Sequence, residues 1–191
     1  MSDPTVIDAA QAEADTRRWL ERAVIGLNLC PFAKAVHVKG QIHYVTYLDT
    51  HEGRLIDALL AEARALVALD AEVRDTTLLI VPHALADFLD FNDFTERAER
   101  KLARAGFDGV LQLASFHPHF QFAGTEADDI TNATNRAPYP TLHVLREDSM
   151  DRAVEAFPEA EAIFERNIET LEALGPDGWT ALDVGPGSAT P

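Results

Sequence analysis

Cysteine is almost absent from this sequence. The 191 residues include a single cysteine, Cys30, so an internal disulfide is excluded. Long apolar runs are missing as well, since no stretch approaches the roughly 18–20 residues that a membrane-spanning helix needs. The N-terminal segment carries Asp3, Asp8, Glu13 and Asp15 and lacks the pattern of a signal peptide. These absences predict a cytoplasmic protein that does not enter a membrane.

Basic residues are also scarce. Lys and Arg number 16 against 32 Asp and Glu, which gives a net charge of −16. This balance argues against nucleic acid and against anionic membrane surfaces, because basic side chains supply most of the affinity for both. Solubility is the simplest meaning of the acidity, and a local basic pocket for a small anionic ligand stays compatible with it. The sequence has neither a glycine-rich phosphate loop nor a Gly-x-Ser-x-Gly motif.

Apolar residues make up 47% of the sequence, enough for one folded domain, which we place at residues 5–184 between flexible ends at 1–4 and 185–191. Strands are expected where β-branched or continuous apolar runs occur, at 41–49, 76–81, 109–116 and 141–146. Helical spacing predicts helices from about 5 to 27, from 52 onward, from 91 or 92 to 105, from 148 or 149 to 157, and from 158 to 174, with a turn or helix break at 28–34. Residues 179–184 form either a short strand or a docked strap.

Side chains that cap helices are expected at three of these starts, and at the helix that runs to 157 the cap is Asp148 or Ser149. Thr50 suits the helix that begins at 52, and Asn92 or Asp93 suits the next helix, which Gly106 follows. Strand and helix alternate, which predicts an α/β or α+β fold: a single layered domain with a four-stranded, partly parallel sheet. A long N-terminal helix and a C-terminal helical pair would cover the sheet. Ligands of open parallel sheets sit beyond the carboxyl ends of strands, and this rule points to His117.

Polar side chains of many kinds gather between residues 112 and 147, and we interpret this stretch as the functional region. In His117-Pro118-His119 two imidazoles could face one side and share a divalent metal with Asp129. A spacing of two is not a specific metal signature, so His117 is equally interpretable as a catalytic residue with Asp129 as its partner, or as a structural residue. Asp129 also fits the cap of a short helical turn.

Further candidates for substrate binding follow in the same stretch. Asn132 and Asn135 could orient a substrate, and Arg136 is either an anion clamp or the partner of an internal acid. His143 and Arg146 lie three apart on the last predicted strand and therefore face opposite sides, so only one of them can point toward a given site.

The Cys30-Pro31-Phe32 sequence invites comparison with glutaredoxin-like redox motifs. In those folds the cysteine follows a strand and opens a helix, whose N-terminus lowers the thiol pKa. Here Cys30 follows a helical pattern, and a second cysteine is missing. We interpret Cys30 as a buried structural residue.

Several motifs together resemble an uncharacterised bacterial family, a domain of unknown function, over nearly the whole chain. They are residues 28–33 (NLCPFA), 76–82 (TTLLIVP), 87–92 (DFLDFN), 115–118 (SFHP), 121–123 (QFA), and 135–147, which contains PYPTLHVLRE. The resemblance implies no reaction. In the pattern of that family an acidic residue often stands at the position of His119, so the resemblance implies that an imidazole there is not obligatory.

Two hypotheses about function follow. In the first, the protein is a small enzyme for a polar or anionic substrate, with metal-assisted hydrolysis as the default reaction and His117 as acid, base or ligand. In the second, the protein is a non-catalytic module that binds a ligand or a protein, and the same polar stretch is a structural network.

Overall fold

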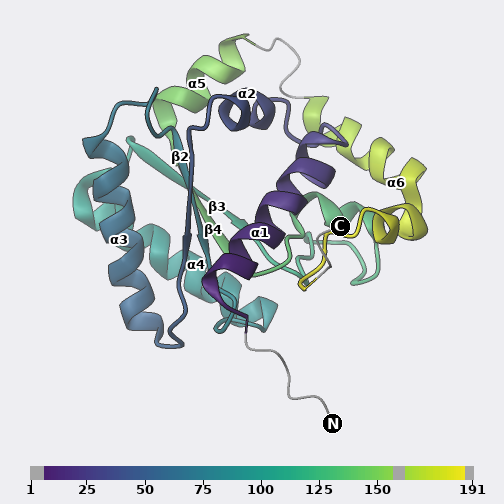
Figure 1. The fold of residues 1–191 in the computed structure, drawn as a ribbon, viewed down its shortest axis with the longest axis horizontal. Coiled ribbons are helices and arrows are strands. Elements are labelled where there is room, and N and C mark those ends of the chain that lie inside the picture. Colours follow the sequence, from purple (N-terminus) through teal and green to yellow (C-terminus); the bar gives the residue numbers. More distant parts are fainter. Residues whose placement is uncertain (1–6, 157–161, 188–191) are drawn as a thin grey trace.

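A computed structural model describes residues 7–156 and 162–187 and is built around one sheet (Figure 1). The order of its four strands is β1-β2-β4-β3; β1 pairs with β2 in parallel, and β4 is antiparallel to both β2 and β3. The strands are β1 (Ile42–Thr46), β2 (Thr76–Ile80), β3 (Leu111–Phe116) and β4 (Thr141–Arg146). Because β1, β2 and β3 run in one direction, the predicted α+β domain with a partly parallel sheet is confirmed.

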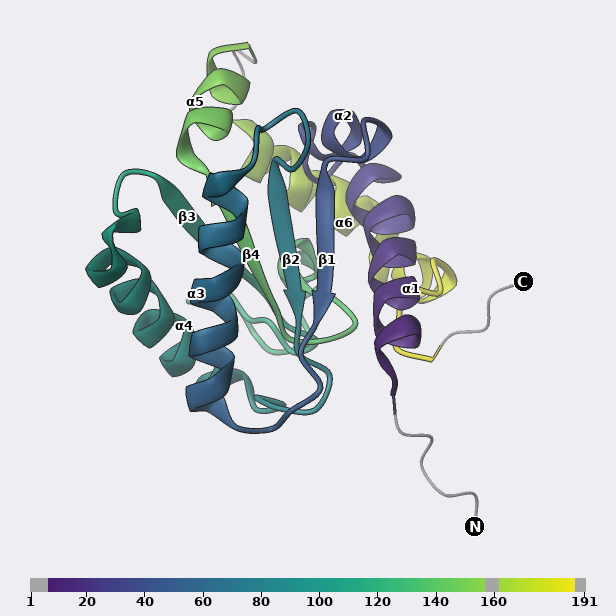
Figure 2. The same ribbon diagram turned by 60° about the vertical axis from the view of Figure 1, so that its left-hand side comes forward.

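One face of the sheet is closed by α3 (Glu52–Ala68) and α4 (Phe88–Leu102), which lie side by side in Figure 2. The apolar stripe of α3 and the aromatic residues of α4 pack against alternate residues of β2 and β4, and this arrangement makes the larger core. Its fully buried members include Leu55, Leu59, Leu79, Phe94 and Leu142. All residues of β2 are buried, as its continuous apolar run predicts for a central strand.

The other face is only partly covered. The helix α1 (Ala9–Trp19) and the π-helical turn η1 (Leu20–Ile25) pack over β1 and β2, and α6 (Ile163–Ala181) packs against the short 3-10 helix η3 (Ile130–Asn135). The short helices α2 (Ala33–Val38) and α5 (Glu147–Ala156) lie together at one end of the sheet in both views (Figures 1 and 2). None of the described helices is both long and apolar enough to cross a membrane.

Three of the predicted helix caps are wrong, although α3 begins at Glu52 as predicted. The helix α5 begins at Glu147, so Asp148 and Ser149 lie inside it and do not cap it. Asp87 caps α4, and its carboxylate accepts hydrogen bonds from the backbone N–H groups of Leu89 and Asp90, so the helix begins before Asn92. The Nδ1 atom of His51 caps α3 in place of Thr50, because it accepts from the N–H of Arg54. In α3 the capping side chain belongs to the residue directly before the helix, and in α4 an earlier capping side chain starts the helix before the predicted one.

The end of the chain also differs from its prediction. Gly175 breaks α6 with a φ of 68°, as expected, but Pro176 starts a new helical segment that runs to Ala181. Trp179 therefore belongs to a helix and not to a strand or a strap. The predicted start at Pro158 lies outside the described residues.

The last described residues attach to α1. The Arg18 guanidinium donates to the carbonyl oxygens of Asp183 and Gly185, and the N–H of Gly187 donates to the carboxylate of Asp15. These bonds hold residues 183–187, part of which we assigned to a flexible end, against the first helix.

Candidate functional site

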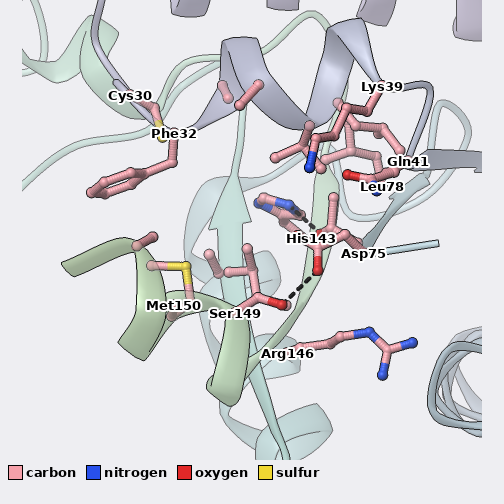
Figure 3. A pocket seen from close by; sticks show the side chains of 18 of the residues that line it. Cys30, Phe32, Lys39, Gln41, Asp75, Leu78, His143, Arg146, Ser149 and Met150 are labelled. Atoms are coloured by element: carbon pink, nitrogen blue, oxygen red, sulfur yellow. Dashed lines mark hydrogen bonds between the residues drawn. The ribbon is translucent and has the colours of Figure 1, made fainter. Parts of the chain in front are cut away.

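A cavity of about 570 Å³ lies over the sheet, on the face that carries α1, and Figure 3 shows side chains that line it. Its floor comes from the sheet, mainly from β2, β3 and β4, and its walls come from the end of α1, from η1, and from α2 and α5. Most of the lining is apolar, and representative members are Trp19, Val24, Phe32, Leu78, Phe116 and Met150. The cavity therefore offers an apolar environment that the described helices do not fill.

His143 is the imidazole in the floor of this cavity (Figure 3). It pairs with Leu78 on one side and Ala114 on the other, so the three side chains share a face of the sheet. Its chain neighbours Leu142 and Val144 point to the opposite face and are fully buried under the helices there. The alternation of β4 thus places one polar residue in an apolar floor.

Hydrogen bonding fixes the tautomer of His143. Its Nε2 atom lies 2.7 Å from Oγ1 of Thr76, and that hydroxyl donates its only proton to the carbonyl oxygen of Val144 at 2.7 Å. The hydroxyl can then only accept from His143, so Nε2 carries the proton. Nδ1 keeps its lone pair, and no described residue donates to it.

Burial in this apolar floor lowers the pKa of His143 to about 4. The imidazole is therefore neutral at physiological pH. It acts as a hydrogen-bond acceptor through Nδ1 and has little positive charge to offer an anion.

The polar residues of the lining gather at one end of the cavity, where β1 and β2 begin. Ser149 donates a hydrogen bond to the carboxylate of Asp75, and the amide of Gln41 donates to both the carbonyl and the carboxylate of Glu72. Lys39 forms an exposed ion pair with Glu72 at 3.7 Å. At this end the charges of Lys39 and Glu72 pair with each other, whereas the Asp75 carboxylate is bound by a neutral hydroxyl.

Arg146 borders the cavity, but its guanidinium group does not point into it. The side chain extends away from His143 (Figure 3) and donates to the carbonyl oxygens of Leu66, Leu69 and Arg74. The prediction that His143 and Arg146 face opposite ways matches this geometry, and His143 is the one that points to the cavity.

Cys30 belongs to the wall, between η1 and α2. Burial raises the pKa of its thiol and outweighs the opposing effect of the N–H groups of Phe32 and Ala33, which point to the sulfur. The thiol therefore stays protonated at neutral pH, which supports our interpretation of Cys30 as a structural residue.

The His117 ring lies on the other face of the sheet, away from the cavity. It is fully buried, its Nε2 donates to the carbonyl oxygen of Leu85 at 3.0 Å, and its Nδ1 accepts from the N–H of His119 at 3.0 Å. Phe88 and Phe91 pack on the ring with centroid distances of 5.4 and 5.1 Å. Burial is the main cause that lowers the His117 pKa. Both nitrogens are engaged inside the protein, as in a structural residue.

Asp129 and Asn132 organise the loop that follows β3. The Asp129 carboxylate caps η3 by accepting from the N–H and the hydroxyl of Thr131, and these bonds lower its pKa. Asn132 is fully buried; it accepts from the N–H of Phe122 and donates to the carbonyl oxygen of Glu126. Neither side chain is directed at the cavity that contains His143.

Asn135 and Arg136 also bind backbone atoms. The amide of Asn135 donates to the carbonyl oxygen of Ser115, and the guanidinium of Arg136 donates to the carbonyl oxygens of Phe120 and Ala127. Arg136 therefore clamps its own loop through backbone carbonyl groups, and these hydrogen bonds serve neither of the two roles predicted for it. These contacts favour the structural network over the catalytic hypothesis for residues 115–136.

The proposed metal ligands do not form a set. Among the described residues, no group of three or more His, Cys, Asp and Glu side chains could hold a metal ion. The predicted ligands His117, His119 and Asp129 therefore do not form such a group. Both ring nitrogens of His117 already have hydrogen-bond partners inside the protein.

The cavity brings together residues that lie far apart in the sequence, so no local sequence pattern predicts it. The one feature of the sequence that points to this cavity is His143, a single histidine in the apolar run of residues 141–145.

Comparisons with known proteins identify a family but no activity. The family model described as "Protein of unknown function (DUF1415)" matches residues 11–181, which confirms the resemblance to a domain of unknown function. No curated protein and no solved structure matches the chain.

Proposed function

Since this chain belongs to the DUF1415 family, whose function is unknown, we propose a function from the cavity: the protein binds a small, mostly apolar molecule over the sheet. The observation that carries the proposal is an apolar cavity of about 570 Å³ in a sheet face that would otherwise need a helix to cover it. Sites for small ligands commonly have volumes of roughly 300–1,000 Å³ and a few placed polar groups.

Local backbone structure supports the same site. Leu20 and Val24, which line the cavity, belong to the π-helical turn η1. Such turns cost helix stability and occur often at functional sites.

The side chains that line the cavity favour ligand binding over catalysis. A general base works best with a pKa near the working pH, whereas that of His143 is about 4. Cys30 is a protonated thiol, so it is a weak nucleophile. An apolar lining also gives less support to our hypothesis of an enzyme for a polar or anionic substrate.

An uncharged fluorescent dye such as Nile red tests the proposal. Trp19 lies in the cavity wall, and a Trp179→Phe background leaves it as the sole tryptophan reporter. We expect saturable dye binding with energy transfer from Trp19. Ala153→Phe should weaken binding at least about tenfold, because the new ring occupies the cavity.

Val154→Phe is the matched control on the same helix. Val154 is exposed and does not line the cavity, so the dye affinity should stay unchanged. Absence of saturable binding, or an equal loss in both variants, would contradict the proposal.

A further inference from the structure

We infer that the ligand is uncharged at its inner end and carries one hydroxyl or N–H group, which donates a hydrogen bond to Nδ1 of His143. This inference rests on the proposed function and names the chemical class of the bound molecule: an apolar alcohol, phenol or N–H heterocycle.

The count of protons around Thr76 carries the inference. One hydroxyl proton lies between Thr76 and the carbonyl oxygen of Val144, so the proton between Thr76 and His143 belongs to the imidazole. A neutral imidazole has one N–H, and Thr76 takes it. His143 therefore presents to the cavity its Nδ1 atom, which can accept a hydrogen bond but cannot donate one.

An acceptor in an apolar floor needs a donor. Leu78 and Ala114 flank His143 and offer no polar hydrogen, and Phe116 lies with its ring centroid 6.0 Å from the imidazole. A ligand that fills the cavity displaces water from Nδ1, and it loses affinity unless it replaces the hydrogen bond. A hydroxyl or N–H group replaces that bond, and an ether or a hydrocarbon does not.

Charged groups suit this position poorly. A carboxylate at Nδ1 would need a protonated His143, and burial lowers the pKa of His143 to about 4, so the imidazole is neutral at pH 7. An ammonium group would need a carboxylate nearby, but the lining acids Glu72 and Asp75 lie at the polar end, bound to Gln41 and Ser149.

Three probes of similar shape separate these classes: 4-propylphenol, 4-propylanisole and 4-propylbenzoate. They offer a donor, a methyl ether without a donor, and an anion. By calorimetric titration at pH 7, we expect the phenol to bind at least about tenfold more tightly than the anisole, and the benzoate to bind most weakly.

Two variants connect the preference to His143. His143→Phe keeps a ring of similar size but has no acceptor, so the phenol should lose its advantage over the anisole. His143→Asn places an amide oxygen near the position of Nδ1 and should keep the phenol preference in part. Melting curves of both variants check that they fold.

The outcomes distinguish this inference from the proposed function. Equal affinities for phenol and anisole, tightest binding of the benzoate, or an unchanged preference in His143→Phe would each overturn the inference and leave the binding of apolar molecules in place. Failure of all three probes would also overturn it if Nile red still binds. If Nile red does not bind either, both proposals fail.

Discussion

The hydroxyl of Tyr139 donates a hydrogen bond of 2.6 Å to the carboxylate of Asp15, across 124 positions of the sequence. Asp15 is fully buried in α1, and Tyr139 lies between two prolines just before β4. The same carboxylate accepts from Arg18 at 2.6 Å and from the N–H of Gly187 at 2.9 Å. One buried charge therefore joins the first helix, the sheet and the last described residues.

Tyr139→Phe should destabilise the protein by about 2 kcal/mol, because it leaves a buried carboxylate with one donor fewer. For a domain of this size that corresponds to a fall in melting temperature of about 4–8 °C. Tyr44→Phe is the matched control. Tyr44 is buried in the same apolar cluster, and its hydroxyl has no partner among the described residues, so its removal should cost almost nothing. Equal losses in the two variants would contradict the role of Asp15.

Asp15 should also make stability depend on pH. Burial alone would raise its pKa, but the hydrogen bonds from Tyr139, Gly187 and Arg18 outweigh burial and lower the pKa below 3.8. A group with a lowered pKa in the folded state stabilises the protein above its unfolded-state pKa, and this contribution disappears as the pH falls through the folded-state value.

Asp15→Asn should therefore be less stable than wild type near neutral pH, and the difference should narrow as the pH falls below about 4. Urea unfolding at a series of pH values measures this, with the exposed Asp151→Asn as the control. A stability difference that stays constant down to about pH 3 would show that the Asp15 charge is not the cause.

The strands could be predicted because their signals are local. The continuous apolar run of residues 76–81 and the run of residues 141–146 correspond closely to β2 and β4. The start of α4 was harder to predict, because Asp87, Asn92 and Asp93 all have side chains that can cap a helix. Asp87 is the cap because the helix must include Phe88 and Phe91, which pack into the core.

The site was harder to predict than the fold. A buried polar side chain looks the same in sequence whether a ligand or the backbone satisfies it. For Asn132 and Arg136 the backbone does so, through loop carbonyl and N–H groups that no pattern reveals. The cavity around His143 depends on which strands are neighbours, and the antiparallel insertion of β4 between β2 and β3 is not visible in the sequence.

His117→Ala should destabilise the protein by about 3 kcal/mol, since it removes a buried ring and leaves the carbonyl of Leu85 and the N–H of His119 unpaired. Leu85 has a φ of 58°, a strained conformation that this hydrogen bond helps to hold. Melting should fall by several degrees, while Nile red affinity at room temperature stays unchanged. The exposed His119→Ala is the control and should melt like wild type. An unchanged melting temperature in His117→Ala would return His117 to the candidates for function.

Asn132→Asp should be the most informative change in the loop after β3, because it alters one functional group and almost no volume. The new carboxylate cannot donate to the carbonyl oxygen of Glu126 and would bury a charge, so we expect a loss of about 2–3 kcal/mol. Asn135→Asp is the matched control, since its amide makes one hydrogen bond of 3.4 Å and is only half-buried. Chemical denaturation of both variants gives the comparison. A structural network predicts a large difference in stability between them with equal dye affinity, whereas a loss of dye affinity in Asn132→Asp with unchanged stability would place this loop in the binding site after all.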